Sequence, residues 1–243
     1  MREVVAATVA ARLWSNNREV AAYVDQVELK DHQSEQLRLI GADYPAFGGR
    51  LLDVGCATGV FLGALAARYP TAALTGIDRN EHLLRLGRAR LADVPTVTLL
   101  NADAIGFEPD AAFDVITAAG VLSLFEDFTP ALDRWLEWLA PGGHLYVFGS
   151  FNSRDIDTII RFRNNAHGDD WQSGLTAYSV ATVSRHLAAR GLTHEFRRFH
   201  LKRMLPPHDD PIRSFTVACA DGSSLLVNGA NVVSELYFLT IQR

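Results

Sequence analysis

A carboxylate stands inside an apolar segment and directly before a turn of small residues. Asp53 lies in the run Leu51–Val54, and Gly55, Ala57 and Gly59 follow at alternate positions. Small residues let the backbone approach a ligand closely, and a helix that begins near Gly59 presents N–H groups without intrahelical partners. A buried carboxylate needs hydrogen-bond donors, and we expect the free N–H groups of this turn, together with a cationic ligand, to supply them.

The spacing of the small residues separates the classes of nucleotide site. A dinucleotide fingerprint that starts at Gly55 requires a third glycine where Val60 stands, so a nicotinamide oxidoreductase is disfavoured. The turn contains no Gly-Lys-Ser/Thr sequence, which excludes a P-loop, and no basic residue to meet a pyrophosphate. Ala57 occupies the place of a middle glycine, and an alanine there is expected to keep φ below zero.

The elements that must position this turn alternate between short apolar runs and amphipathic helices. Strands are predicted at Leu51–Val54, Ala73–Ile77, Thr96–Leu100, Phe113–Ala118 and His144–Phe148, and helices at Val60–Tyr69, Glu81–Leu91 and Pro130–Leu139. Continuous apolar strands separated by helices indicate an α/β fold: a doubly wound, mostly parallel seven-stranded sheet with helices on both faces. A helix is predicted over about Ser179–Arg190, and an antiparallel finish at about Arg213–Cys219, Ser224–Val227 and Glu235–Gln242.

The pattern changes at two places and predicts the domain organisation. Residues 1–48 are expected to form an N-terminal helical cap or lid, with a break at Asn16 and Asn17. Residues 49–243 are expected to form one Rossmann-like domain. Within it, the polar and irregular residues 150–175 predict an insertion on the substrate side of the sheet.

Several segments, in order, resemble the motifs of the class I (Rossmann-like) S-adenosylmethionine-dependent methyltransferase family. They are Asp53–Gly59, Gly76–Asp78, Asn101–Asp103, Phe113–Ile116 with Ala119–Leu122, and Leu139–Leu145. The resemblance extends over about residues 51–148. It implies S-adenosyl-L-methionine as the cofactor and S-adenosyl-L-homocysteine as its product.

The resemblance also implies roles for single residues. Asp53 supports the amino end of the methyl donor, S-adenosyl-L-methionine. Asp78 accepts hydrogen bonds from its ribose hydroxyls, and Asp103 recognises the edge of its adenine ring. The full set of implied cofactor-binding residues is Asp53, Gly55, Cys56, Ala57, Gly59, Asp78, Arg79, Asp103, Ala104 and Ala119. Structural alternatives stay open: Asp53 binding its own turn, Asp78 capping a helix and Asp103 forming a turn.

The candidate general base is His167, because it lies in the polar insertion after the fifth predicted strand. A surface position in a loop is the alternative, and His208 is the second candidate. Trp14, Tyr23, His32 and Trp171 lie in segments that the family uses to cover substrate, although packing explains them equally well. No metal site is expected.

Composition limits the remaining function classes. The formal net charge of −5 disfavours a protein that binds nucleic acid by covering its phosphates with Lys and Arg side chains. No apolar run in the sequence is long enough to span a membrane. With only two cysteines, a cytoplasmic protein is expected. The predicted function is methylation of O, N or C on a small molecule, in natural-product or other secondary metabolism. A donor-binding scaffold or regulatory protein without methyl transfer is the alternative, and a homodimer stays open.

Overall fold

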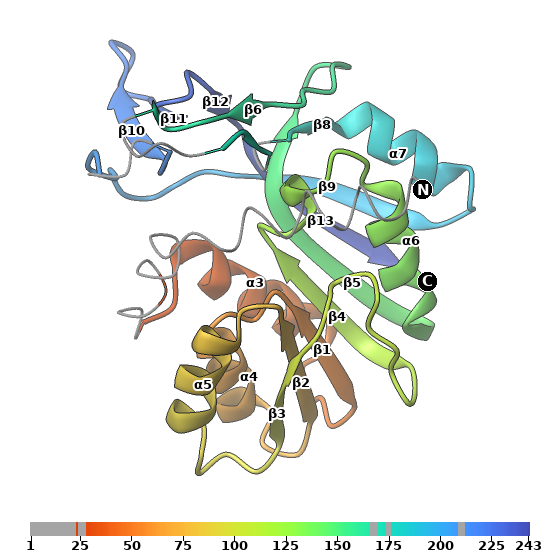
Figure 1. Cartoon of the computed structure of the whole chain (residues 1–243). Coiled ribbons are helices and arrows are strands. Elements are labelled where there is room, and N and C mark those ends of the chain that lie inside the picture. The colour runs from red at the N-terminus through yellow and green to blue at the C-terminus, as the bar shows by residue number, and fades with distance from the viewer. Residues whose placement is uncertain (1–22, 24–27, 166–169, 174–175, 209–211) are drawn as a thin grey trace.

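One mixed sheet forms the centre of the molecule (Figure 1). The computed structural model describes residue 23 and residues 28–165, 170–173, 176–208 and 212–243 of the 243-residue chain. The order of its main strands is β3-β2-β1-β4-β5-β13-β9. These strands are β1 (Arg50–Val54), β2 (Ala73–Asp78), β3 (Val97–Asn101), β4 (Phe113–Ala119), β5 (Leu139–Asn152), β9 (Thr193–Phe199) and β13 (Leu236–Gln242). The first five are mutually parallel, so their carboxyl ends share one edge of the sheet.

Helices cover both faces of this sheet, as the sequence predicts. They are α3 (Asp31–Asp43), α4 (Val60–Arg68), α5 (Glu81–Arg90), α6 (Thr129–Glu137) and α7 (Val180–Ala188). Successive side chains of a strand point to opposite faces. Leu51 therefore packs with α3, α4 and α5 in one core cluster, whereas Leu52 packs with α6 and α7 in the other. The predicted doubly wound fold is confirmed, including helices on both faces.

The C-terminal part of the described chain supplies two strands to this sheet and a second, smaller sheet. Strand β13 is antiparallel to both of its neighbours, β5 and β9. Strands β10 (Phe215–Ala218), β11 (Ser224–Val227) and β12 (Val233–Ser234) form a separate antiparallel sheet. The antiparallel finish is thus present, but it is divided between two sheets (Figure 1).

The described residues between β5 and α7 contain only short strands. They are β6 (Arg161–Phe162), β7 (Gln172–Ser173) and β8 (Tyr178–Ser179), of which β8 pairs with the end of β5. The hydroxyl of Ser179 accepts the N–H of Thr182 at 2.8 Å and caps α7. The helix ends at Ala188, and Gly191 adopts φ +68° shortly after it, so the sequence placed this helix correctly to within a turn.

The fifth strand begins earlier than the sequence predicts. Phe113 pairs with Leu139, and after an irregularity Val115 pairs with His144, so the Pro-Gly-Gly turn is part of β5. A Cβ at Gly143 would lie 2.8 Å from the backbone oxygen of Asp114, which explains the glycine at this close approach.

The boundaries at residue 48 and at residues 150–175 stay predictions, and the helices expected before residue 23 lie outside the described residues. Within the described part of the chain, we find no helix that is both long enough and apolar enough to cross a bilayer.

Candidate functional site

The turn after β1 contains three residues in the left-handed region. Gly55, Ala57 and Gly59 have φ values of +75°, +49° and +69°. The expectation that Ala57 keeps φ below zero is therefore wrong. The physical reason is a hydrogen bond: the N–H of Ala57 donates to Oδ2 of Asp78 at 2.9 Å, which holds the backbone in a conformation that costs a non-glycine residue about 1–2 kcal/mol.

The N–H groups of this turn are used within the protein. Those of Gly55 and Cys56 both donate to the carbonyl oxygen of Ile77, at 2.8 and 3.1 Å, and that of Gly59 donates to the carbonyl oxygen of Cys56 at 2.9 Å. The expectation that free N–H groups of the turn compensate Asp53 is consequently wrong for Gly55, Cys56 and Ala57, whose N–H groups donate to the end of β2, and for Gly59, whose N–H donates within the turn.

Thr117 compensates Asp53 instead. It stands beside Asp53 in the register of β1 and β4, and its hydroxyl donates to Oδ1 of Asp53 at 2.7 Å. Only 5% of Asp53 is exposed. The pKa of Asp53 is raised to about 7, chiefly by burial; the hydrogen bond from the Thr117 hydroxyl opposes this rise, and the charge of Asp78 contributes to it. Near neutral pH this side chain is therefore poised between its acid and its carboxylate.

Asp78 is a second buried carboxyl at the same edge of the sheet, with 6% exposure. Its Oδ1 accepts the N–H of Asn80 at 2.8 Å, and its Oδ2 accepts that of Ala57. Burial raises the pKa of Asp78, opposed by the backbone N–H groups of Asn80, Ala57 and Arg79. Each oxygen has a further lone pair with which it can accept a hydrogen bond from a ligand.

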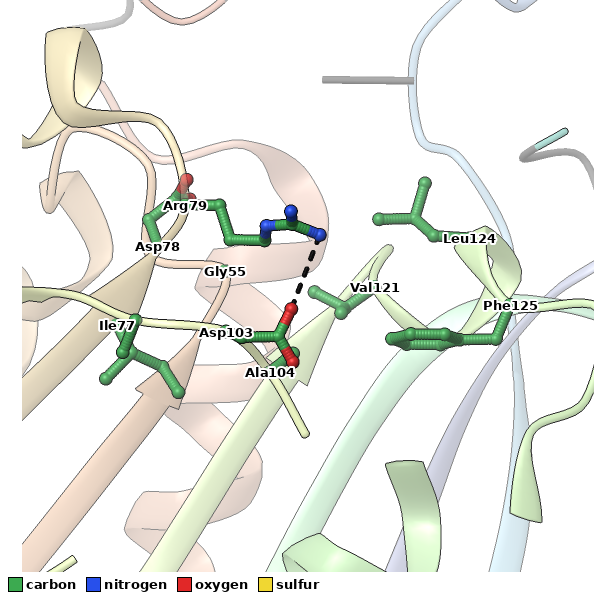
Figure 2. A pocket seen from close by; sticks show the side chains of 10 residues that line it. Gly55, Ile77, Asp78, Arg79, Asp103, Ala104, Val121, Leu124 and Phe125 are labelled. Atoms are coloured by element: carbon green, nitrogen blue, oxygen red, sulfur yellow. Dashed lines mark ion pairs between the residues drawn. The ribbon is translucent and has the colours of Figure 1, made fainter. Parts of the chain in front are cut away.

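A first pocket opens at the ends of β2 and β3 (Figure 2). Its polar side comes from Asp78, Arg79 and Asp103, and its apolar side from Val121, Leu124 and Phe125. Gly55, Ile77, Ala102 and Ala104 complete the lining. A flat apolar ring that carries hydroxyl groups at one end is chemically complementary to these walls.

An ion pair lies at this pocket, between Nη1 of Arg79 and Oδ2 of Asp103 at 3.3 Å (Figure 2). The other oxygen of Asp103 accepts the N–H groups of Ile105 and Gly106, at 2.9 and 3.0 Å. With 45% of its side chain exposed, Asp103 is far more hydrated than Asp78. Its contribution to any ligand is therefore smaller.

A second pocket adjoins the first and shares Gly55 and Val121 with it. Asp53, the turn after β1 and Ala119 to Gly120 after β4 form one side. The other side comes from Phe148 on β5 and from residues before and on α3, namely Tyr23, Lys30, His32, Gln33 and Gln36. Thr58, Val60 and Phe61 also line it.

His32 is a neutral wall of this second pocket. Its ring stacks on Phe148 with centroids 4.3 Å apart and an interplanar angle of 2°. Burial and the charge of Lys30 lower the pKa of His32 to about 3. The ring therefore carries no charge at any pH at which the protein is expected to act.

The structure brings most of the residues expected at a cofactor site to the two pockets. Gly55, Asp78, Arg79, Asp103 and Ala104 line the first, and Asp53, Gly55, Cys56, Ala57 and Ala119 line the second. Gly59 lines neither. It stands before α4, and a Cβ there would lie 2.8 Å from Cδ1 of Leu91, which favours glycine at this position. Its role at the cofactor stays a prediction.

The expected catalytic residue, His167, lies outside the described residues. His208 is described; it lines neither pocket, and its Nε2 lies 3.1 Å from Nη1 of Arg213. Burial raises the pKa of the Cys56 thiol well above its usual range, so this cysteine is not a nucleophile. No group of His, Cys, Asp and Glu residues suited to a metal ion occurs in the described ranges.

Sequence reasoning missed several site residues. Val121 could have been predicted as a site residue, because it belongs to the Ala119–Leu122 segment of the motif. Thr117 is recognised only from the register of β4 against β1. Lys30 and Gln36 come from outside every motif, and no pattern in the sequence singles them out.

Comparison with known proteins supports the resemblance found in the sequence. Residues 52–145, which run from β1 into β5 and contain the turn and all three acids, match the family model described as "Methyltransferase domain". Over this part the chain is similar to the class I S-adenosylmethionine-dependent methyltransferases. The cofactor of this family is S-adenosyl-L-methionine.

One relative of this chain is named after a small-molecule substrate. "Trans-aconitate 2-methyltransferase" of Streptomyces coelicolor is 28% identical over 179 residues, which cover 69% of this chain and 58% of that protein. The chain thus spans less than two thirds of that relative's length.

Two solved structures share the fold of this chain. The N-methyltransferase NodS from Bradyrhizobium japonicum WM9, in complex with S-adenosyl-L-homocysteine, is 20% identical with a TM-score of 0.58, covering 93% of this chain and 97% of that chain. CalS10, an amino pentose methyltransferase from Micromonospora echinaspora, is 22% identical with a TM-score of 0.56, covering 94% and 97%.

Proposed function

We propose that this chain transfers a methyl group from S-adenosyl-L-methionine to an oxygen, nitrogen or carbon nucleophile of a small molecule. The observation that supports it most is the junction of the two pockets at Gly55 and Val121. A ligand with an adenosine part in the first pocket and an amino-acid part in the second would have its sulfur beside this junction. The methyl group would then face the second pocket.

In the first pocket we assign the ribose to Asp78. Its two oxygens already accept backbone N–H groups, and their remaining lone pairs suit the two ribose hydroxyls. The adenine ring is assigned to the space between Ala104 and the apolar side chains of Val121 and Phe125. The Arg79–Asp103 pair lies where the ring edge would end.

In the second pocket we assign the ammonium group of the donor to Asp53. A cation beside this carboxyl favours its ionised form, which burial alone disfavours. Gly55, Cys56, Ala57 and Ala119 line the same pocket and would contact the donor through their backbone.

The chemistry assigned to the protein is mainly positioning. S-adenosyl-L-methionine supplies a methyl group that its positively charged sulfur has already activated. The two pockets would hold the nucleophile in line with that methyl group, and orientation of this kind is worth up to about 7–11 kcal/mol of the barrier. An amine acceptor only has to arrive unprotonated, whereas a hydroxyl acceptor needs a base, for which His167 stays a prediction.

A small acceptor, from natural-product or other secondary metabolism, is part of the proposal. The names of the relatives above, which refer to trans-aconitate and to an amino pentose in calicheamicin biosynthesis, support it. Residues before and on α3 line the second pocket, which favours the view that segment 1–48 covers the acceptor. The substrate-side role of residues 150–175, the absence of nucleic-acid binding, a cytoplasmic location and a homodimer stay predictions.

Two measurements test the proposal. Isothermal titration should detect binding of S-adenosyl-L-homocysteine, without competition from NAD or ATP. Formation of S-adenosyl-L-homocysteine from S-adenosyl-L-methionine should then be measured across a panel of small hydroxyl, amine and activated-carbon acceptors. Tight NAD binding without response to either sulfur compound would contradict donor binding. Donor binding without product across the panel would favour the scaffold alternative.

A further inference from the structure

A third pocket lies apart from the two pockets proposed for the donor, between the smaller sheet and the ends of β9 and β13. Strands β10, β11 and β12 form one side of it, and residues 198–201 and 235–236 form the other. Its cavity volume is about 280 Å³, close to the range of roughly 300–1,000 Å³ that small-molecule sites span. The cavity is therefore large enough for a small ligand or for one part of a larger ligand.

The smaller sheet turns hydroxyl groups toward this pocket. Side chains alternate between the two faces of a strand, and the register of the sheet places Thr216 and Ser234 on the face that lines the pocket. Val217, Leu225 and Val233 lie on the opposite face, where they are 44–58% exposed. An antiparallel sheet that only packs on a core turns its apolar face inward. The reversed pattern indicates that the space behind this sheet suits a polar occupant.

Several polar side chains of the third pocket are available to a ligand. The hydroxyls of Ser224 and Ser234 and the ring of His200 make no hydrogen bond to any described residue. Each hydroxyl can donate one hydrogen bond and accept two, and the imidazole adds two nitrogen atoms. A ligand that both donates and accepts hydrogen bonds would satisfy these groups.

The third pocket contains an ion pair rather than a single charge. Nη2 of Arg198 lies 3.0 Å from Oε1 of Glu235. Burial opposes ionisation of Glu235, but hydrogen bonds from Ser153 and the charges of Arg198 and Arg154 lower its pKa below the usual value. A cationic ligand would be repelled by the guanidinium and an anionic ligand by the carboxylate. The pair therefore favours a neutral ligand, to which it can still donate and accept hydrogen bonds.

The third pocket lies at the same edge of the main sheet as the donor pockets. Strands β9 and β5 are both antiparallel to β13, so the carboxyl end of β9 reaches the edge at which β5 ends. Phe199 lines the third pocket and Phe148 the second, and their ring centroids are 5.5 Å apart. Four strand spacings of about 4.8 Å separate β1 from β9, so a ligand that reaches both pockets extends over roughly 19 Å.

We propose that the third pocket holds an uncharged, hydroxyl-rich ring, a saccharide, which forms part of the methyl acceptor. This inference rests on the proposed function, because the reacting atom of the acceptor has to reach the methyl group beside the second pocket. The hydroxyls of the sugar exchange hydrogen bonds with Ser224, Ser234 and His200, and the ion pair adds further donors and acceptors without selecting a charge. The methylated atom then belongs to the aglycone and not to the sugar.

Binding of simple sugars tests the pocket itself. The probes are the methyl glycosides of glucose, galactose, mannose and xylose, with glucuronate and glucosamine as charged counterparts, and NMR titration measures their affinities. At least one neutral glycoside should bind with the roughly millimolar affinity that a ligand of this size reaches. It should bind more tightly than glucuronate or glucosamine.

A double variant locates the bound sugar. Ser224→Ala combined with Ser234→Ala removes both available hydroxyls and should weaken the glycoside roughly tenfold, a few-fold for each hydrogen bond. Ser214→Ala is the matched control, because Ser214 is exposed, stands directly before β10 and lines none of the three pockets. The control should bind the glycoside like the wild type. Equal binding of S-adenosyl-L-homocysteine by the wild type and both variants shows that the fold is intact.

Methyl transfer tests the assignment to the acceptor. Pairs of hydroxyl and amine acceptors that differ only in an attached sugar are compared. The glycosylated member of an active pair should have a KM about tenfold lower than its aglycone. The double variant should remove this advantage and leave kcat unchanged, because the sugar contributes only binding.

The failures of the two proposals are distinguishable. The saccharide site would be overturned if no neutral glycoside bound, if a charged sugar bound more tightly, or if the double variant kept its affinity. A sugar that binds without lowering KM in any pair would overturn its assignment to the acceptor. A wild type that binds a glycoside but transfers no methyl group to any acceptor would instead contradict the proposed function.

Discussion

The two pockets are built from different parts of the chain. Apart from Gly55, the first is lined by the last two residues of β2 and by residues that follow β2, β3 and β4, where the ends of parallel strands meet. The second takes one side from the same sheet edge, but its other side comes from α3 and the residues before it. The sheet thus fixes the site that the family shares, while the segment outside it provides Lys30, His32 and Gln36.

Substitution of Gly55, in the wall between the two pockets, should have the largest effect on stability and on methyl transfer. A Cβ at Gly55 would lie 2.5 Å from Cγ2 of Val121, which lines both pockets. Gly55→Ala should cost about 2–5 kcal/mol of folding free energy, from left-handed strain and overlap together. Methyl transfer should slow roughly 100-fold or more, because both parts of the donor shift. Thermal unfolding and product formation measure the two effects.

Gly142→Ala is the matched control for Gly55→Ala. Gly142 has φ +79°, and nothing lies within 4 Å of a Cβ built there. The Gly142→Ala variant should lose only the folding free energy that left-handed strain costs, about 1–2 kcal/mol, and should keep normal methyl transfer. If the two variants lose the same stability and keep the same activity, Val121 does not restrict the junction.

Within the first pocket, the buried acid should matter more than the exposed one. Asp78→Asn should weaken S-adenosyl-L-homocysteine roughly 10- to 100-fold, because buried hydrogen bonds to a charged acceptor are lost. Asp103→Asn should weaken it only a few-fold, because Asp103 is half-exposed. Isothermal titration of both variants measures the difference. A larger effect at Asp103 would show that the ribose is not bound at Asp78.

In the second pocket, donor affinity should depend on the protonation of Asp53. The pKa of Asp53 in the folded protein, about 7, lies above the usual value of about 4. Protonation of Asp53 therefore stabilises the ligand-free fold. This contribution to stability is complete below about pH 4 and is lost as the pH rises from about 4 to 7. A ligand ammonium needs the ionised form. Affinity for S-adenosyl-L-homocysteine should therefore rise about tenfold between pH 5.5 and 7 and then level off.

Asp53→Asn is the control for this pH dependence. The asparagine cannot ionise, so the variant should bind weakly with a flat profile over the same range. Asp78, whose pKa is also raised by burial, remains in this variant. A profile for Asp53→Asn that still rises like that of the wild type would assign the titration to Asp78.

The smallest effect is expected where the turn is strained. Ala57→Gly removes the methyl group from a left-handed residue with φ +49°. It should stabilise the protein by about 1 kcal/mol or less, since glycine also gains entropy in the unfolded chain. Thermal unfolding measures this shift. Asn231→Gly, at φ +58°, is the comparison and should gain less, because asparagine tolerates this region. A destabilised Ala57→Gly would mean that the methyl group contributes packing that outweighs its strain.

Much of the fold was predictable because hydrophobic periodicity determines it. Apolar runs such as Leu51–Val54 and helix faces such as that of Trp135 and Leu136 gave the right elements and the doubly wound class. The start of β5 was missed, because proline and two glycines there indicate a turn, whereas the backbone of Asp114 comes close enough to keep the chain in the strand.

The candidate site was predictable only where strand ends determine it. Asp53 and Asp78 lie at the carboxyl ends of the parallel strands β1 and β2, and Asp103 follows β3, so all three lie at one edge of the sheet. The Thr117 hydroxyl on Asp53 and the left-handed Ala57 depend on contacts between segments distant in sequence. Lys30 and Gln36 reach the pocket through the packing of α3 on the sheet, which periodicity does not reveal.

The place of β13 between β5 and β9 has a consequence for synthesis of the protein. Among the described strands, β9 meets the rest of the main sheet only through β13, which follows it along the chain. On the ribosome, β9 therefore emerges before this partner exists, and the edge of β5 that pairs with β13 stays open until then. Unpaired edges promote aggregation of nascent chains. This part of the sheet is accordingly completed only once β13 has been synthesised.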